Sequence, residues 1–105
     1  MRRLLLISAG LALCAAAASA AGITTVAQRG RAFVVTAVQV ARGDTVHFVN
    51  DDAFVHQVFV QSPGFNYESE EQEPGQVLDI RFTSAGTFTV RCHIHPKMVL
   101  QVEAR

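Results

Sequence analysis

Apolar and polar residues alternate in several short segments after residue 20, and a period of two is typical of β-strands. Leu78, Ile80 and Phe82 alternate with polar positions in segment 77–83. No stretch keeps apolar residues at the three-to-four spacing of a helix over several turns. The pattern predicts strands at 23–28, 33–41 (one or two), 45–50, 56–61, 77–83, 87–92 and 98–103.

Turn-forming residues separate these segments, and composition supports the same interpretation. Residues 21–105 contain 14 Val, 7 Phe and 7 Thr but 2 Leu, a balance that favours strands. Segment 65–74, closed by Pro74-Gly75, is predicted to be irregular and acidic. About seven short strands in so small a domain predict an all-β fold, an antiparallel sandwich or a small barrel.

The first 20 residues form a different pattern. Two arginines precede a 15-residue apolar run, and Ala18-Ser19-Ala20 ends it. This order predicts a signal peptide at 1–20, a domain at 21–105 and export to the periplasm. The alternative is a retained membrane anchor, but a span needs about 20 apolar residues. We therefore expect no stable membrane insertion.

Charge and size exclude several classes of function. The whole chain is neutral, and residues 21–105 hold 7 basic and 9 acidic residues, a net charge of −2. A basic stripe for nucleic acid is missing, and 105 residues exclude a large multidomain enzyme. Removal of Cys14 with the signal peptide leaves Cys92 alone, so this thiol must be buried, paired between chains or bound to something.

Residues 92–98 read Cys-His-Ile-His-Pro-Lys-Met, which places a thiol, two imidazoles and a thioether within seven positions. Thiolate and thioether together favour copper, and imidazole suits it as well. Zinc sites rarely use Met, and iron–sulfur clusters need several Cys. The spacing therefore predicts a copper site.

The predicted strands show how one loop can supply three ligands. Cys92 ends a strand, and Met98 begins the next; we expect Ile94 to turn back toward the core. His95 precedes Pro96, whose fixed φ makes a tight corner there. His56, after an Asp-Asp turn, is the best candidate for a fourth ligand. Two His, one Cys and a weak axial Met form the blue-copper electron-transfer arrangement.

The segment 50–60, Asn-Asp-Asp-Ala-Phe-Val-His-Gln-Val-Phe-Val, resembles the first-ligand strand of the cupredoxins. The Cys-x2-His-x2-Met loop is similar to the short ligand loop of the amicyanins. The stretch 28–98 resembles small bacterial plastocyanin-like proteins, often labelled methylamine-utilization proteins. The resemblance implies a Greek-key antiparallel β-sandwich and one type 1 copper ion, with His56, Cys92, His95 and Met98 as its ligands.

Two positions depart from the family pattern. Gln57 stands where Asn is common after the first His, and His93 where Ser or Thr is common after the Cys. In the family these side chains help to tie the ligand loops together, and such contacts orient ligands and tune the metal. The departures leave copper binding in place but leave the rigidity and redox potential of the site open.

Other polar residues have plainer interpretations. We expect His93 at the surface or beside the ligands, and His47 on an open sheet face. Segment 68–73 carries four carboxylates, Glu68, Glu70, Glu71 and Glu73, and is predicted to be a solvated loop. The alternative is a docking patch that steers a basic redox partner.

These features predict a periplasmic, monomeric carrier of single electrons that cycles between Cu(I) and Cu(II). We expect transient contacts with a protein redox donor and acceptor, and no enzymatic activity. One alternative is a copper chaperone or storage protein that holds Cu(I) without relaying electrons. Another is a thiol enzyme that uses Cys92 with His93 or His95 as the base.

Overall fold

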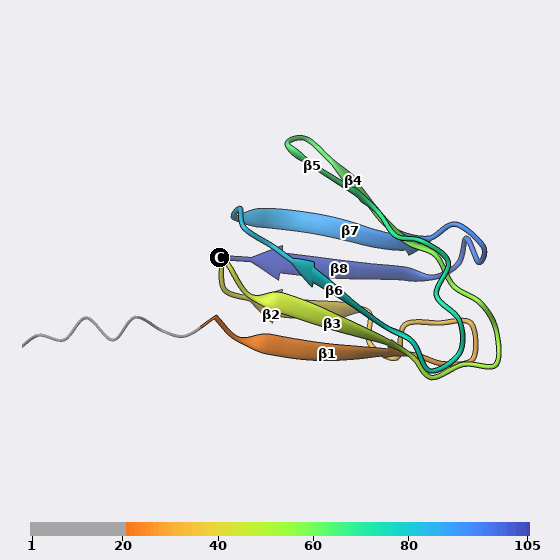
Figure 1. Ribbon diagram of the computed structural model, residues 1–105. Coiled ribbons are helices and arrows are strands. Elements are labelled where there is room, and N and C mark those ends of the chain that lie inside the picture. The colour runs from red at the N-terminus through yellow and green to blue at the C-terminus, as the bar shows by residue number, and fades with distance from the viewer. Residues whose placement is uncertain (1–20) are drawn as a thin grey trace, which may run out of the picture.

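Eight β-strands form two packed sheets in the computed structural model, which describes residues 21–105 (Figure 1). The predicted signal peptide, residues 1–20, lies outside the described residues. Between residues 21 and 105 no helix is long and apolar enough to cross a membrane. The strands are β1 (Ile23–Gln28), β2 (Ala37–Val40), β3 (Thr45–Asn50), β4 (Val58–Ser62), β5 (Phe65–Glu68), β6 (Val77–Arg81), β7 (Gly86–Cys92) and β8 (Val99–Ala104).

The smaller sheet has the strand order β1-β3-β6, and the larger has the order β2-β8-β7-β4-β5. The predicted all-β sandwich is therefore confirmed. Four of the six strand pairs are antiparallel, whereas β1 with β3 and β2 with β8 run parallel. β1 and β3 are parallel because the chain between them passes through β2 in the larger sheet. It then returns to the smaller sheet, where β3 runs beside β1 in the same direction.

One hydrophobic core fills the space between the sheets. Val46 and Phe48 of β3 and Val90 of β7 belong to it, and all three side chains are fully buried. Burial of a side chain of this size contributes roughly 1.5–3 kcal/mol. In β7, Phe88, Val90 and Cys92 are buried at alternate positions, as the pattern predicts.

The strand β5 is a departure from the sequence prediction, which placed Phe65–Glu68 in an irregular segment. Pro63 and Gly64 form a tight connection from β4, and Gly64 has a φ of 78° that favours glycine. Phe65 and Tyr67 then pack their half-buried rings against the core. Tertiary packing thus overrides the acidic character of the neighbouring residues. Another difference is that β4 begins at Val58, two residues after the predicted start.

The loops that follow β1, β3, β5 and β7 gather at one end of the sandwich, at the right of Figure 1. Backbone hydrogen bonds join them: Asp51 N–H donates to Gln28 O at 3.0 Å, and His93 N–H donates to Gln57 O at 2.9 Å. Residues far apart in the sequence therefore meet at this end, among them those predicted to bind copper.

Candidate metal centre

Cys92 is the last residue of β7, and its side chain is buried in the core. It lies opposite Val58 in the antiparallel pair of β7 and β4. The backbone N–H of Gln57 points at its sulfur, with the nitrogen 3.4 Å from Sγ. A donor in this position stabilises a thiolate, because hydrogen bonds to an ionised acceptor are the stronger ones.

His56 lies just before β4, with its side chain fully buried. Its backbone forms two hydrogen bonds with the backbone of Gln72, at 3.0 and 2.6 Å. These bonds fix the main chain at His56 to the loop that contains Gln72. The imidazole Nδ1 lies 3.7 Å from Sγ of Cys92. At the opposite edge of the ring, Nε2 lies 3.0 Å from a carboxylate oxygen of Asp52.

His95 lies in the loop between β7 and β8 and is partly exposed. Its Nδ1 is 3.1 Å from Nδ1 of His56 and 4.0 Å from Sγ of Cys92. The N–H of Met98 donates to the carbonyl of His95 at 2.9 Å and closes the loop. Burial lowers the pKa of His95; the neighbouring His56 and Arg31 lower it further, whereas Asp52 opposes the shift. The ring therefore favours the neutral form, which has a lone pair for a metal.

The donor atoms of His56, Cys92 and His95 converge: all lie within 4.8 Å of one another. Met98, the fourth predicted residue, is 1% exposed and stands directly before β8. Imidazole and thiolate donors suit copper, and Asp52 engages Nε2 of His56 so that Nδ1 is left for a metal. The residues at this site therefore fit a copper ion.

Gln57 and His93, which depart from the family pattern, still connect the two ligand segments. The backbone bond from His93 to Gln57 joins them directly, and Gln57 Nε2 donates to Ser69 O at 2.9 Å. The ring of His93 stacks on Phe59, with centroids 3.8 Å apart, and its Nε2 lies 3.2 Å from Glu68. The loops are therefore tied together by other contacts.

Two further expectations have different outcomes. His47 lies on the outer face of the smaller sheet, as the alternation predicts, and it pairs there with Asp79 of β6. Ile94 does not turn to the core: its side chain is 42% exposed. The prediction for Ile94 is wrong because the extended strand ends at Cys92, so its alternation does not continue into the loop.

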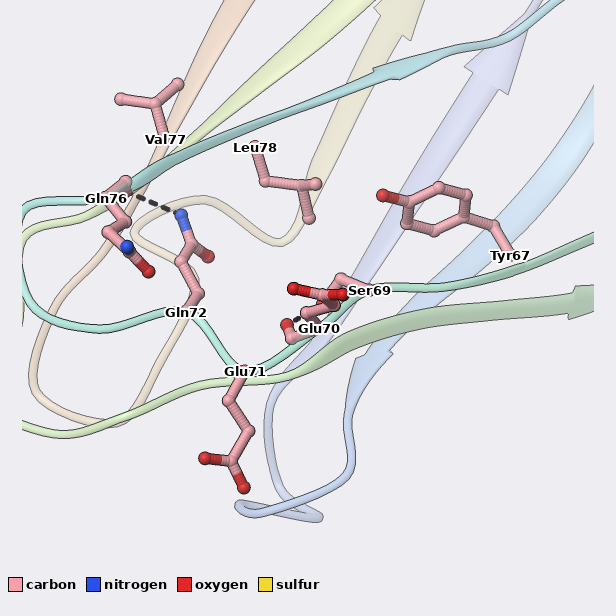
Figure 2. A pocket seen from close by; sticks show the side chains of 8 residues that line it. All are labelled: Tyr67, Ser69, Glu70, Glu71, Gln72, Gln76, Val77 and Leu78. Atoms are coloured by element: carbon pink, nitrogen blue, oxygen red, sulfur yellow. Dashed lines mark hydrogen bonds between the residues drawn. The ribbon is translucent and has the colours of Figure 1, made fainter.

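The acidic segment lies at an open edge of the sandwich. A pocket of about 390 Å³ lies there between β5 and β6, and Figure 2 shows its lining side chains. Glu70 and Glu71 line it together with Gln72 and Tyr67, and in Figure 2 Glu71 points away from the others. Burial raises the pKa of Tyr67. No predicted copper ligand lines this pocket, although Gln72, which does, is hydrogen-bonded to the backbone of His56.

Sequence reasoning missed two residues that support the centre. The sequence places Asp52 in a turn, yet it contacts His56 four residues later. The sequence places Gln72 in a solvated loop, yet it is 3% exposed and its backbone is hydrogen-bonded to that of His56. The four-residue spacing between Asp52 and His56 is a signal that the sequence contains. The contact between Gln72 and His56 spans 16 positions, and no local pattern indicates it.

Comparison with known proteins agrees with this geometry. An amicyanin variant in the reduced state superposes with a TM-score of 0.74, at 26% identity over 82% of this chain and 85% of that one. A purple cupredoxin from Nitrosopumilus maritimus shares the fold, with a TM-score of 0.70 at 18% identity over 78% of this chain and 99% of that one.

A copper-containing nitrite reductase from Thermus scotoductus SA-01 also matches, at 28% identity and a TM-score of 0.70. The match covers 78% of this chain and 22% of the reductase. The sequence model of the copper-binding proteins of the plastocyanin/azurin family matches residues 20–104. Since this match spans almost the whole sandwich and the converging donors suit copper, the chain belongs to the plastocyanin/azurin family of copper-binding proteins.

Proposed function

We propose that the protein is a periplasmic carrier of single electrons, with a type 1 copper ion held by His56, Cys92, His95 and Met98. The convergence of two Nδ1 atoms and one Sγ within 4.8 Å carries this proposal. Two His and one Cys with an axial Met are the ligands of blue-copper electron-transfer sites. When bound, the copper ion supplies a one-electron couple between Cu(II) and Cu(I).

The surroundings of the donors favour a carrier over a storage protein. Cys92 and His56 are buried, at the end of β7 and just before the adjoining strand β4, and the backbone N–H of Gln57 donates to the sulfur. Donors held in this way keep nearly the same positions when the charge of the ion changes. Fast electron transfer requires such a small rearrangement. Burial of Cys92 also speaks against a thiol enzyme, because an external substrate does not reach the sulfur.

His95 provides the route to a partner. It is the partly exposed member of the centre, and its ring and that of Phe54 form a T-shaped pair with centroids 6.1 Å apart. Phe54 and Ile94 are both exposed beside it. In this proposal, residues 21–105 act as an exported monomer, and protein donors and acceptors dock transiently near His95.

The visible spectrum tests the copper site. Protein loaded with Cu(II) turns intensely blue, because the Cys92 thiolate transfers charge to the ion, and Cys92→Ser abolishes the colour. His93→Ala is the matched control: it lies in the same loop, outside the proposed ligand set, and keeps the colour. A pale complex of the unmodified protein, or a blue Cys92→Ser variant, contradicts the proposal.

Voltammetry separates the carrier from a copper chaperone. A carrier gives a reversible one-electron wave at fast scan rates, since its donors stay in place in both oxidation states. A protein that holds Cu(I) without relaying electrons gives a slow or irreversible response. That second outcome assigns the site to copper storage.

A further inference from the structure

A carboxylate lies against the fully buried ligand ring. Asp52 precedes His56 by four residues, and one oxygen of its carboxylate, Oδ2, is 3.0 Å from Nε2 of His56. The side chain of Asp52 is 6% exposed and that of His56 is 0% exposed. The contact is therefore shielded from water. An interaction between a carboxylate and an imidazole is screened much less in such a buried place than in water.

Backbone donors hold the carboxylate in place. Oδ2 also accepts a hydrogen bond from the N–H of Arg31 at 2.7 Å, and Oδ1 accepts one from the N–H of Ala53 at 2.9 Å. Arg31 adopts a φ of 57°, uncommon for a residue with a side chain, and its guanidinium lies 3.9 Å from the centre of the Phe54 ring. The loop after β1 therefore supplies one of the donors to Asp52.

An ionised carboxylate accepts hydrogen bonds and does not donate them. This acceptor favours the form of His56 that carries a proton on Nε2 and a lone pair on Nδ1, the atom 3.7 Å from Sγ of Cys92. The backbone N–H groups of Arg31 and Ala53 both donate to this carboxylate, and such donors favour its ionised form. The acceptor is accordingly charged at neutral pH.

We propose that Asp52 is a positioning residue for the metal centre: its carboxylate fixes the Nδ1-binding form of His56 and stabilises Cu(II) relative to Cu(I). The proposal rests on the copper-carrier function above. A carboxylate that accepts the second N–H of a ligand imidazole makes the ring a stronger donor. Its negative charge also favours the more highly charged ion, so the carboxylate lowers the redox potential.

The potential of Asp52→Asn tests the electrostatic part. The substitution keeps the shape of the side chain and removes its charge, and loss of such a partner typically weakens metal binding 10–100-fold. We expect about a tenfold shift of the Cu(II)/Cu(I) affinity ratio toward Cu(I), a rise in potential of about 59 mV for one electron.

Asp51→Asn is the matched control. It removes the same charge one residue away, but Asp51 is exposed and pairs with Arg29 rather than with His56. We expect a much smaller shift for this variant. Equal potentials for the two variants overturn the proposal, because a purely structural Asp52 or a general charge effect predicts that result.

Nitrogen NMR of the metal-free protein tests the positioning part without copper. We expect His56 to carry its proton on Nε2 in the unmodified protein and to lose this single form in Asp52→Ala. A proton on Nδ1 of His56 in the unmodified protein overturns the proposal even where no variant folds. If the unmodified protein is blue but Asp52→Asn leaves the potential unaltered, only the role of Asp52 is refuted. If the unmodified protein gives a pale spectrum, the carrier function is refuted.

Discussion

The two histidines of the metal centre stand in opposite kinds of surroundings. His56 is fully buried, its backbone is paired with Gln72, and its ring is held by Asp52. His95 is partly exposed in a loop that a hydrogen bond from Met98 closes. One half of the centre is therefore rigid and closed, and the other half is open to solvent and to partners.

Removal of each ring gives the largest expected difference between the two halves. Both His56→Gly and His95→Gly lose the blue colour of the copper protein. Added imidazole restores colour in His95→Gly, because the gap opens to solvent, and does not restore it in His56→Gly, whose gap is sealed. The visible spectrum during an imidazole titration measures this. Equal recovery of both variants contradicts the division into closed and open halves.

Gln72→Ala tests how the closed half is held. Its amide accepts from Gln28 and donates to Phe48 O and Gln76 O, at 2.7 to 3.0 Å. Loss of these bonds leaves buried polar groups unpaired, and we expect the free energy of unfolding to fall by about 1–3 kcal/mol. Chemical denaturation of the metal-free protein measures the change.

The neighbouring exposed residue is the control for Gln72. Glu71→Ala changes the same loop without touching the network and leaves the free energy of unfolding within about 0.5 kcal/mol. Similar destabilisation by both variants indicates that the loop, rather than the Gln72 amide, supports His56.

The smallest expected effect is a pH dependence that comes from the open half. The pKa of His95 is lowered in the folded protein from its usual 6.5, so below that pH the unfolded chain binds more protons. The free energy of unfolding of the metal-free protein therefore falls as pH drops through about 6.5. Denaturation at a series of pH values measures this slope. His95→Ala reduces it, and an unchanged slope refutes the assignment to His95.

The strand pattern and the ligand types were visible in the sequence because both depend on near neighbours. Alternation predicted that Phe88, Val90 and Cys92 face inward, and the structure confirms it. The same rule failed at Ile94, where the strand had already ended. It also missed β5, since the packing of Phe65 and Tyr67 is invisible in an acidic segment.

Contacts between distant segments were beyond a local pattern. Gln72 meets Gln28 across 44 positions, and Asp52 meets the N–H of Arg31 across 21. The first requires two loops to reach the same end of the sandwich, and the second requires the left-handed backbone at Arg31. Neither condition follows from the residues on either side.

The sequence by itself determined the chemistry: an all-β chain with one thiol, two imidazoles and a thioether at a spacing that predicts copper. The tertiary structure decided how the two histidines differ. The order of the strands buries the side chain of His56 and leaves that of His95 partly exposed in the loop between β7 and β8. The physical reason is that ligand type and spacing belong to the local chain, whereas burial and hydrogen-bond partners depend on which distant segments pack together.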